Sequence, residues 1–198
     1  MKGMKLFMNM KRFINFFCCK FLYKVNYVGL ENLNLVNQLL ICPNHSNIFD
    51  PFFIYPVSNN LYIMAKAELF NHKLFAKLLK HYNVFPVDRT RKDPGSLLYA
   101  LDVFNTKEHR QLLIFPEGGI LKTDDEIGKR IRKGAIFVAA KMKLPIIPVY
   151  ITRRPKLFSK VNVIFGKPFY VEQEILSDKE KLKNKSKELI DIIYKLKI

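Results

Sequence analysis

The chain of 198 residues has few cysteines, no long uninterrupted apolar run and no acidic residue in its first 24 positions. Its three cysteines, Cys18, Cys19 and Cys42, form neither an even set nor a CxxC pair. This count argues against a disulfide framework and a zinc knuckle, and it predicts a reduced, intracellular protein with no metal site.

The most apolar stretch runs from Phe13 to Tyr23 and is interrupted by Asn15 and Lys20. A membrane-spanning helix needs roughly 20 apolar residues, so we expect none here. The bulky aromatic residues and the lysine are also unlike a cleaved signal peptide. We find no internal repeat and no low-complexity linker, and an apolar content of 49% indicates a globular domain.

Basic residues outnumber acidic ones by 34 to 17, which gives a formal net charge of +17. The positive electrostatic field of such a charge favours an anionic partner: nucleic acid, an acidic membrane leaflet, a phosphorylated substrate or an acidic carrier protein. The sequence contains no RNP-like aromatic motif, no zinc pair and no recognisable helix-turn-helix, so nucleic acid is not the expected partner. It specifies no oligomeric state.

Residues 1–24 form the first predicted unit, a membrane-association segment, and residues 25–198 form the second. At helical spacing, apolar and polar side chains of the segment fall on different sides. The apolar side holds Leu6, Met10, Phe13, Phe17 and Phe21, and the polar side holds Lys5, Asn9, Arg12 and Lys20. Each basic residue beside an anionic leaflet contributes about 1 kcal/mol to the free energy of membrane binding, so the pattern favours a helix that lies at the membrane interface. The alternative is an ordinary amphipathic helix packed on the domain.

Short apolar runs alternate with helical patterns along the rest of the chain. Strands are predicted at residues 25–28, 39–42, 61–65, 84–87, 111–115, 146–151 and 161–165, and helices at 51–57, 68–81, 94–105 and 133–143. This alternation is typical of an α/β domain with a central, largely parallel sheet flanked by helices. A final helix is expected after Ser177, which forms a capping box with Glu180.

The stretch NHSNIFDP, residues 44–51, places His45 five positions before Asp50. On a continuous helix these side chains would point roughly 140° apart, so contact between them requires a loop. Asp50 as N-cap and Pro51 at the first helical position would start a helix after such a loop. His45 would then lie beyond the carboxyl end of a strand, where α/β sheets place their sites. The alternative is a capping pair without chemistry.

Three further stretches have the same placement relative to strands. VFPVDR ends in Arg89, whose planar guanidinium group suits a phosphate. The alternative is a solvated arginine in a loop. FPEGG places Glu117, Gly118 and Gly119 after a strand, where backbone N–H groups can approach an oxyanion or a phosphate, unless the glycines only form a tight turn. LPIIPV, residues 144–149, is suited to forming an apolar wall.

In this order the four stretches resemble the glycerolipid acyltransferase family, which contains lysophosphatidic acid acyltransferase. NHxxxxD, an apolar stretch ending in Arg, FPEG and a proline-centred apolar block are the family's four motifs, and GLENL, RKGA and FGKPF are similar as well. The resemblance covers residues 25–170. Two departures stand out: Asn83 replaces a usual glycine, and Gly119-Ile120-Leu121 replaces Thr-Arg-Ser. The charge of that missing arginine is expected from Lys122, Lys129, Arg130, Arg132 or Lys133.

The resemblance implies acyl transfer from acyl carrier protein or coenzyme A to the hydroxyl of 1-acylglycerol 3-phosphate, without a bound cofactor. It implies that His45 is the general base, Asp50 orients it, and Arg89 holds the acceptor phosphate. Glu117 would organise the acceptor or its loop, and the N–H groups of Gly118 and Gly119 would bind the oxyanion.

The implied location is peripheral, on the anionic cytoplasmic face of the cell membrane. Two alternatives stay open: glycerol 3-phosphate or another lysophospholipid as the acceptor, and a non-catalytic basic relative that binds membranes.

Overall fold

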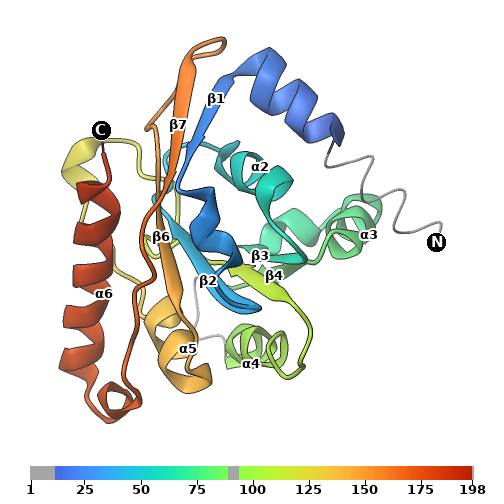
Figure 1. Ribbon diagram of the computed structural model, residues 1–198. Coiled ribbons are helices and arrows are strands. Elements are labelled where there is room, and N and C mark those ends of the chain that lie inside the picture. Colours follow the sequence, from blue (N-terminus) through green and yellow to red (C-terminus); the bar gives the residue numbers. More distant parts are fainter. Residues whose placement is uncertain (1–11, 89–93, 198) are drawn as a thin grey trace.

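A seven-stranded sheet forms the centre of the computed structural model, which describes residues 12–88 and 94–197 (Figure 1). All the predicted strands are present, close to their expected bounds. They are β1 (Lys24–Val28), β2 (Gln38–Pro43), β3 (Leu61–Lys66), β4 (Val84–Val87), β5 (Arg110–Leu113), β6 (Ile146–Ile151) and β7 (Lys160–Phe165).

The strand order is β1-β7-β6-β2-β5-β3-β4. Strands β6, β2, β5, β3 and β4 run parallel to one another, whereas β7 is antiparallel to β6 and β1 is parallel to β7. The prediction of a largely parallel sheet is therefore confirmed. Because parallel strands end at the same edge, the segments that follow β2, β4, β5 and β6 are brought together there.

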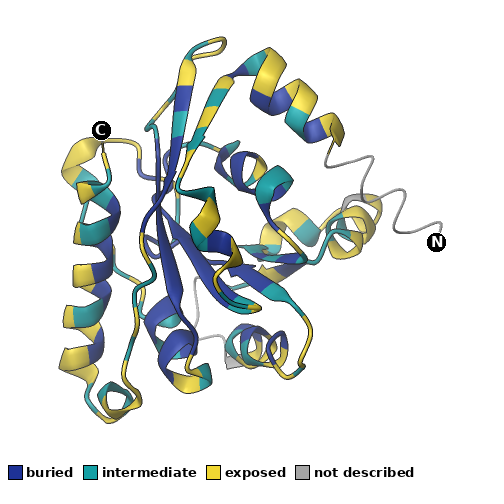
Figure 2. Cartoon of the chain, in the orientation of Figure 1, coloured by how far each residue is buried: buried dark blue, intermediate teal, exposed yellow. Residues whose placement is uncertain are grey.

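Helices cover both faces of the sheet (Figure 1). One layer holds η1 (Asn15–Leu22), α2 (Asp50–Ile54), η3 (Tyr55–Val57), η4 (Ala67–Phe70) and α3 (Lys73–His81), and the other holds α4 (Pro94–Asp102), α5 (Gly134–Met142) and α6 (Lys179–Lys195). Strand β2 serves both cores, since Leu39 and Ile41 face the first layer and Leu40 and Cys42 the second. Figure 2 shows the sheet buried between helices with exposed outer sides.

Three predicted helices differ in detail. The helix at residues 51–57 becomes 3-10 at Tyr55, because Pro56 lacks the N–H that an α-helix would bond to residue 52. The helix at residues 68–81 is split by an extended His72 into η4 and α3. The N-cap of α6 is Asp178, whose Oδ1 accepts the N–H groups of Glu180 and Lys181, so the capping box at Ser177 was wrong.

The predicted N-terminal helix lies partly outside the described residues, which begin at position 12. In the described part, Phe13, Phe17 and Phe21 are exposed and stack along the helix with centroids 5.6 and 5.8 Å apart. The opposite side buries Ile14, Cys18 and Cys19 in the core shared with the sheet. The boundary at residue 24 thus stays a prediction. None of the described helices is long and apolar enough to cross a membrane.

Candidate active site

Asn44 fixes the start of the first motif at the end of β2. Its side-chain amide donates to the Ile151 carbonyl at 3.0 Å and accepts the Ile151 N–H at 2.7 Å. The fully buried side chain therefore pairs with β6 as another strand residue would, beyond the point where the β2 backbone leaves the sheet. The loop that carries His45 begins from this fixed point.

His45 and Asp50 are in contact, as the loop interpretation required. His45 Nδ1 lies 2.9 Å from Asp50 Oδ2, and the same oxygen accepts the N–H groups of Ser46 and Asn47 at 2.8 and 2.9 Å. The carboxylate therefore points back into the loop instead of capping α2, and that helix begins at Asp50 itself. The N-cap assignment of Asp50 was wrong, while Pro51 does lie in the first turn.

The His45 ring is held on its other side by Phe115, with centroids 3.8 Å apart and planes 20° apart. Only 8% of His45 is exposed, so the ring has little freedom to rotate. A carboxylate can only accept, so Nδ1 carries the hydrogen that Asp50 binds, and Nε2 is the nitrogen that can take a proton.

Glu117 is almost completely buried, with 1% exposed, and both of its carboxylate oxygens have partners in the fold. Oε2 accepts the backbone N–H of His45 at 2.8 Å, and Oε1 accepts the Tyr194 hydroxyl at 2.5 Å. Burial raises the pKa of Glu117, and these two hydrogen bonds oppose that rise. The resemblance implied that Glu117 organises the acceptor or its loop, and this geometry favours a role in the loop, where Glu117 holds the His45 backbone.

The glycines after Glu117 form a tight turn. Gly118 has φ +71°, and its N–H donates to the Phe115 carbonyl at 3.0 Å. That amide therefore closes the turn and does not fit the predicted oxyanion donor, so the prediction now rests on Gly119. Beyond it, Leu121 is fully buried and donates its N–H to the His45 carbonyl at 2.8 Å. The Ile120 side chain is apolar and 39% exposed, so it cannot replace a phosphate-binding arginine.

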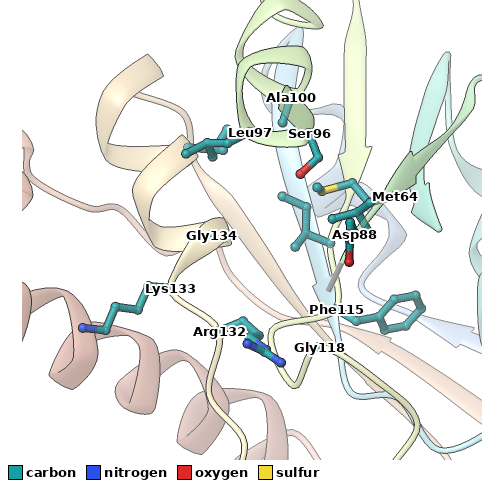
Figure 3. A pocket seen from close by; sticks show the side chains of 13 residues that line it. Met64, Asp88, Ser96, Leu97, Ala100, Phe115, Gly118, Arg132, Lys133 and Gly134 are labelled. Carbon is teal, nitrogen blue, oxygen red and sulfur yellow. The ribbon is translucent and has the colours of Figure 1, made fainter. Parts of the chain in front are cut away.

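A cavity of about 280 Å³ opens beside this turn, between α4 and α5 (Figure 3). Apolar side chains form most of it, and Asp88, Ser96, Arg132 and Lys133 are the polar members that Figure 3 labels around it. The apolar members are Met64, Val87, Leu97, Ala100, Ile114, Phe115 and Val138. Phe115 thus lines the cavity and also stacks on His45.

Of the five basic residues expected to replace the missing arginine, Arg132 is the one that lies on the turn. A Cβ placed on Gly118 would come within 2.6 Å of Arg132 Cγ, so only glycine leaves room for this side chain. Lys133 also lines the cavity, but its Nζ donates to the Lys179 carbonyl. Arg89, the predicted phosphate ligand, lies outside the described residues.

Two arginines that the sequence analysis overlooked connect the loops around the site. Arg153 donates to Asp124 and to the Thr123 carbonyl, and the Arg154 backbone N–H donates to Ser46 Oγ at 2.9 Å. Arg154 Nη2 also reaches Asp124 at 2.6 Å. The acidic turn Asp124–Glu126 is thereby attached to the segment after β6. An Arg-Arg pair directly after an apolar strand was the available signal.

The acyltransferase family model matches residues 24–152, about two thirds of the chain. The chain belongs to the acyltransferase family. Two bacterial relatives bear the name 1-acyl-sn-glycerol-3-phosphate acyltransferase. The Streptococcus pneumoniae protein is 29% identical over 139 residues, which cover 67% of this chain and 50% of that protein. The Bacillus subtilis protein is 28% identical over 153 residues, or 74% of each.

The fold of this acyltransferase family member is also found in a solved structure. The Thermotoga maritima 1-acyl-sn-glycerophosphate acyltransferase, PlsC, superposes with a TM-score of 0.70 over 98% of this chain and 80% of that one. At 20% identity this likeness concerns the fold. Within residues 12–88 and 94–197, no group of three or more His, Cys, Asp or Glu side chains is arranged to hold a metal ion.

Glu117 should make stability depend on pH. Its folded pKa lies above the ordinary 4.5, so over the pH range between the two values the folded state holds a proton that the unfolded state has released. Relative to Glu117→Gln, the wild-type free energy of unfolding should therefore fall as pH rises above 4.5, by at most about 1.4 kcal/mol per pH unit. Urea unfolding between about pH 4 and pH 7 measures this difference, and a rise with pH would contradict the assignment.

Proposed function

We propose that this protein transfers a fatty acyl group from an acyl thioester to the free hydroxyl of 1-acylglycerol 3-phosphate. The observation that carries the proposal is the His45–Asp50 pair held against Phe115, the first residue of the FPEG motif. The names of the bacterial relatives support the same acceptor. The donor is an acyl carrier protein or coenzyme A thioester, and no bound cofactor takes part.

In this reaction His45 Nε2 takes the proton of the acceptor hydroxyl, and the hydroxyl oxygen attacks the carbonyl carbon of the thioester. The tetrahedral intermediate then collapses, the carbon–sulfur bond breaks, and the departing thiolate receives the proton from His45. Asp50 keeps Nδ1 protonated and stabilises the imidazolium. Ser46 is given no role as a nucleophile, because nothing resembling GxSxG surrounds it.

The acceptor phosphate is assigned to Arg132, together with Arg89 as predicted from the sequence. The Arg132 guanidinium lies at a cavity that is mostly apolar, and this combination suits an amphiphile with a phosphate head and an acyl chain. Glycerol 3-phosphate has the head without the chain, so the site favours a lysophospholipid as the acceptor.

The location assigned to the protein is peripheral, on the anionic cytoplasmic face of the cell membrane. The described part of the N-terminal segment presents stacked Phe13, Phe17 and Phe21 side chains to the exterior. Aromatic rings that are exposed on one side of a helix, in a chain of net charge +17, suit an anionic interface.

Replacing His45 with alanine should lower acyl transfer by about 10²- to 10⁴-fold, because the general base is lost. The assay uses both thioester donors against 1-acylglycerol 3-phosphate, glycerol 3-phosphate and a second lysophospholipid. The matched control is His72→Ala, which removes an exposed histidine directly before α3. Wild-type turnover in His45→Ala would rule out the mechanism, and an inactive wild-type protein would favour a non-catalytic relative.

Arg132→Ala should raise the KM for the acceptor by roughly 10-fold or more, since a charge-assisted hydrogen bond contributes about 1.5–3 kcal/mol. The control is Arg130→Ala, an exposed arginine two positions away that does not line the cavity. Both variants lose one positive charge, so a difference between them cannot come from net charge. Equal KM values in the two variants would remove Arg132 from the acceptor site.

Changing Phe13, Phe17 and Phe21 to serine should reduce sedimentation with phosphatidylglycerol vesicles, because the exposed apolar stripe is lost. Deletion of residues 1–24 is a poorer test, since Ile14, Cys18 and Cys19 belong to the core. The control is Leu98→Ser, which removes an exposed apolar side chain from α4 in the other layer. Unchanged sedimentation would assign membrane attachment to another surface.

A further inference from the structure

Glu117 links the predicted catalytic loop to the C-terminal helix α6. The Tyr194 hydroxyl, near the end of α6, donates to Glu117 Oε1 at 2.5 Å. The other oxygen of the same carboxylate accepts the backbone N–H of His45 at 2.8 Å. One buried side chain therefore stands between residue 194 and the residue that carries the proposed base.

Arg153 determines the direction of the Tyr194 hydrogen bond. Its Nη1 lies 2.8 Å from the Tyr194 hydroxyl, and its guanidinium lies 5.8 Å from the centroid of the Tyr194 ring. An arginine can only donate, so the hydroxyl accepts from Arg153 and has its own hydrogen left for Glu117. The Tyr194 hydroxyl is thus hydrogen-bonded to Arg153 on one side and to Glu117 on the other, with its hydrogen directed to the carboxylate.

These residues lie beyond the part of the chain that defines the family. The family model matches residues 24–152, whereas Arg153 follows directly and Tyr194 lies 42 positions after its end. In Figure 1 the end of α6 lies beside the segment that contains Asp124, to which Arg153 also donates. The contact between α6 and the site therefore joins Tyr194, outside the matched region, to Glu117, inside it.

We propose that Tyr194 is a positioning residue for His45, acting through Glu117, and that α6 is in this way a working part of the acyl-transfer site. The inference rests on the proposed function, because His45 is the general base only in that reaction. The Tyr194 hydroxyl touches neither substrate nor the reacting atoms. Its task is to hold Glu117 so that the carboxylate fixes the backbone from which the His45 ring extends.

Loss of the hydroxyl would leave Oε1 of a buried carboxylate without its donor. An unpaired buried carboxylate is unfavourable, so the side chain would turn, take up water or bind a proton. Each of these changes alters the acceptor offered to the His45 N–H. Because Asp50 and Phe115 hold the ring within a narrow range, a small displacement of the backbone is enough to misplace Nε2.

The test compares Tyr194→Phe with Tyr150→Phe in acyl transfer. Tyr150 is a buried neighbour whose ring lies 6.2 Å from that of Tyr194, so the control removes a hydroxyl from the same region without touching Glu117. Tyr194→Phe should lower kcat by about 10- to 100-fold with the acceptor KM unchanged. Tyr150→Phe should keep the wild-type kcat. Equal kcat values in Tyr194→Phe and the wild type would overturn the inference.

A double-mutant cycle separates positioning through Glu117 from a general loss of stability. In the Glu117→Gln background the further change Tyr194→Phe should have little effect on kcat, because the connection is already altered. Independent effects that multiply in the double variant would mean that Tyr194 acts by another route, and would overturn the proposal.

A spectroscopic readout does not require activity. The chain has four histidines, so protein labelled with ¹⁵N-histidine gives four backbone amide signals, and His45→Ala identifies the one that belongs to His45. Tyr194→Phe should move that signal, and Tyr150→Phe should not. An unmoved His45 amide would overturn the inference even in an active enzyme. Wild-type protein that transfers no acyl group would overturn the proposed function, and the amide signal would still decide whether Tyr194 holds the His45 backbone.

Discussion

The hydrogen bond from the His45 N–H to the buried Glu117 carboxylate depends on the adjacency of β2 and β5. The two strands are parallel and paired from Gln38 with Arg110 onward, so the NHxxxxD and FPEG segments leave the sheet side by side. Glu117 then reaches across to the backbone of the neighbouring loop, and Leu121 returns a hydrogen bond to the His45 carbonyl. His45 is therefore held by the third motif through both groups of its main chain.

The strands could be predicted because each is a short apolar run with a polar boundary, which is a local property. The contact of His45 with Asp50 is also local, since five positions and a proline determine the loop. The N-cap error has the same origin: Asp before Pro has the same appearance whether the carboxylate turns forward into the helix or back into the loop. Here the His45 ring and the backbone N–H groups of Ser46 and Asn47 all donate to the Asp50 carboxylate, so it turns back into the loop.

The hydrogen-bond partners of Glu117 could not be predicted from the sequence around it. Tyr194 lies 77 positions away, and only the packing of α6 beside β6 brings its hydroxyl to the carboxylate. The replacement of the usual arginine posed the same difficulty, because five basic residues follow the altered turn. Of these five, the fold places Arg132 on the turn, where the positive φ and the missing side chain of Gly118 leave room for an arginine.

One side of the N-terminal helix packs on the domain, and membrane contact of its other, exposed side stays a prediction. Cys19 Sγ donates to the Phe52 carbonyl at 3.6 Å, and the Tyr27 hydroxyl donates to the Phe53 carbonyl at 2.9 Å. Both acceptors lie in α2, the helix that Asp50 begins. Helix η1, which carries exposed phenylalanines, therefore contacts the helix whose first residue, Asp50, lies against His45. A membrane that binds those aromatic rings, as proposed, would also set the distance between its surface and His45. A base that acts on an acceptor embedded in the membrane requires such a set distance.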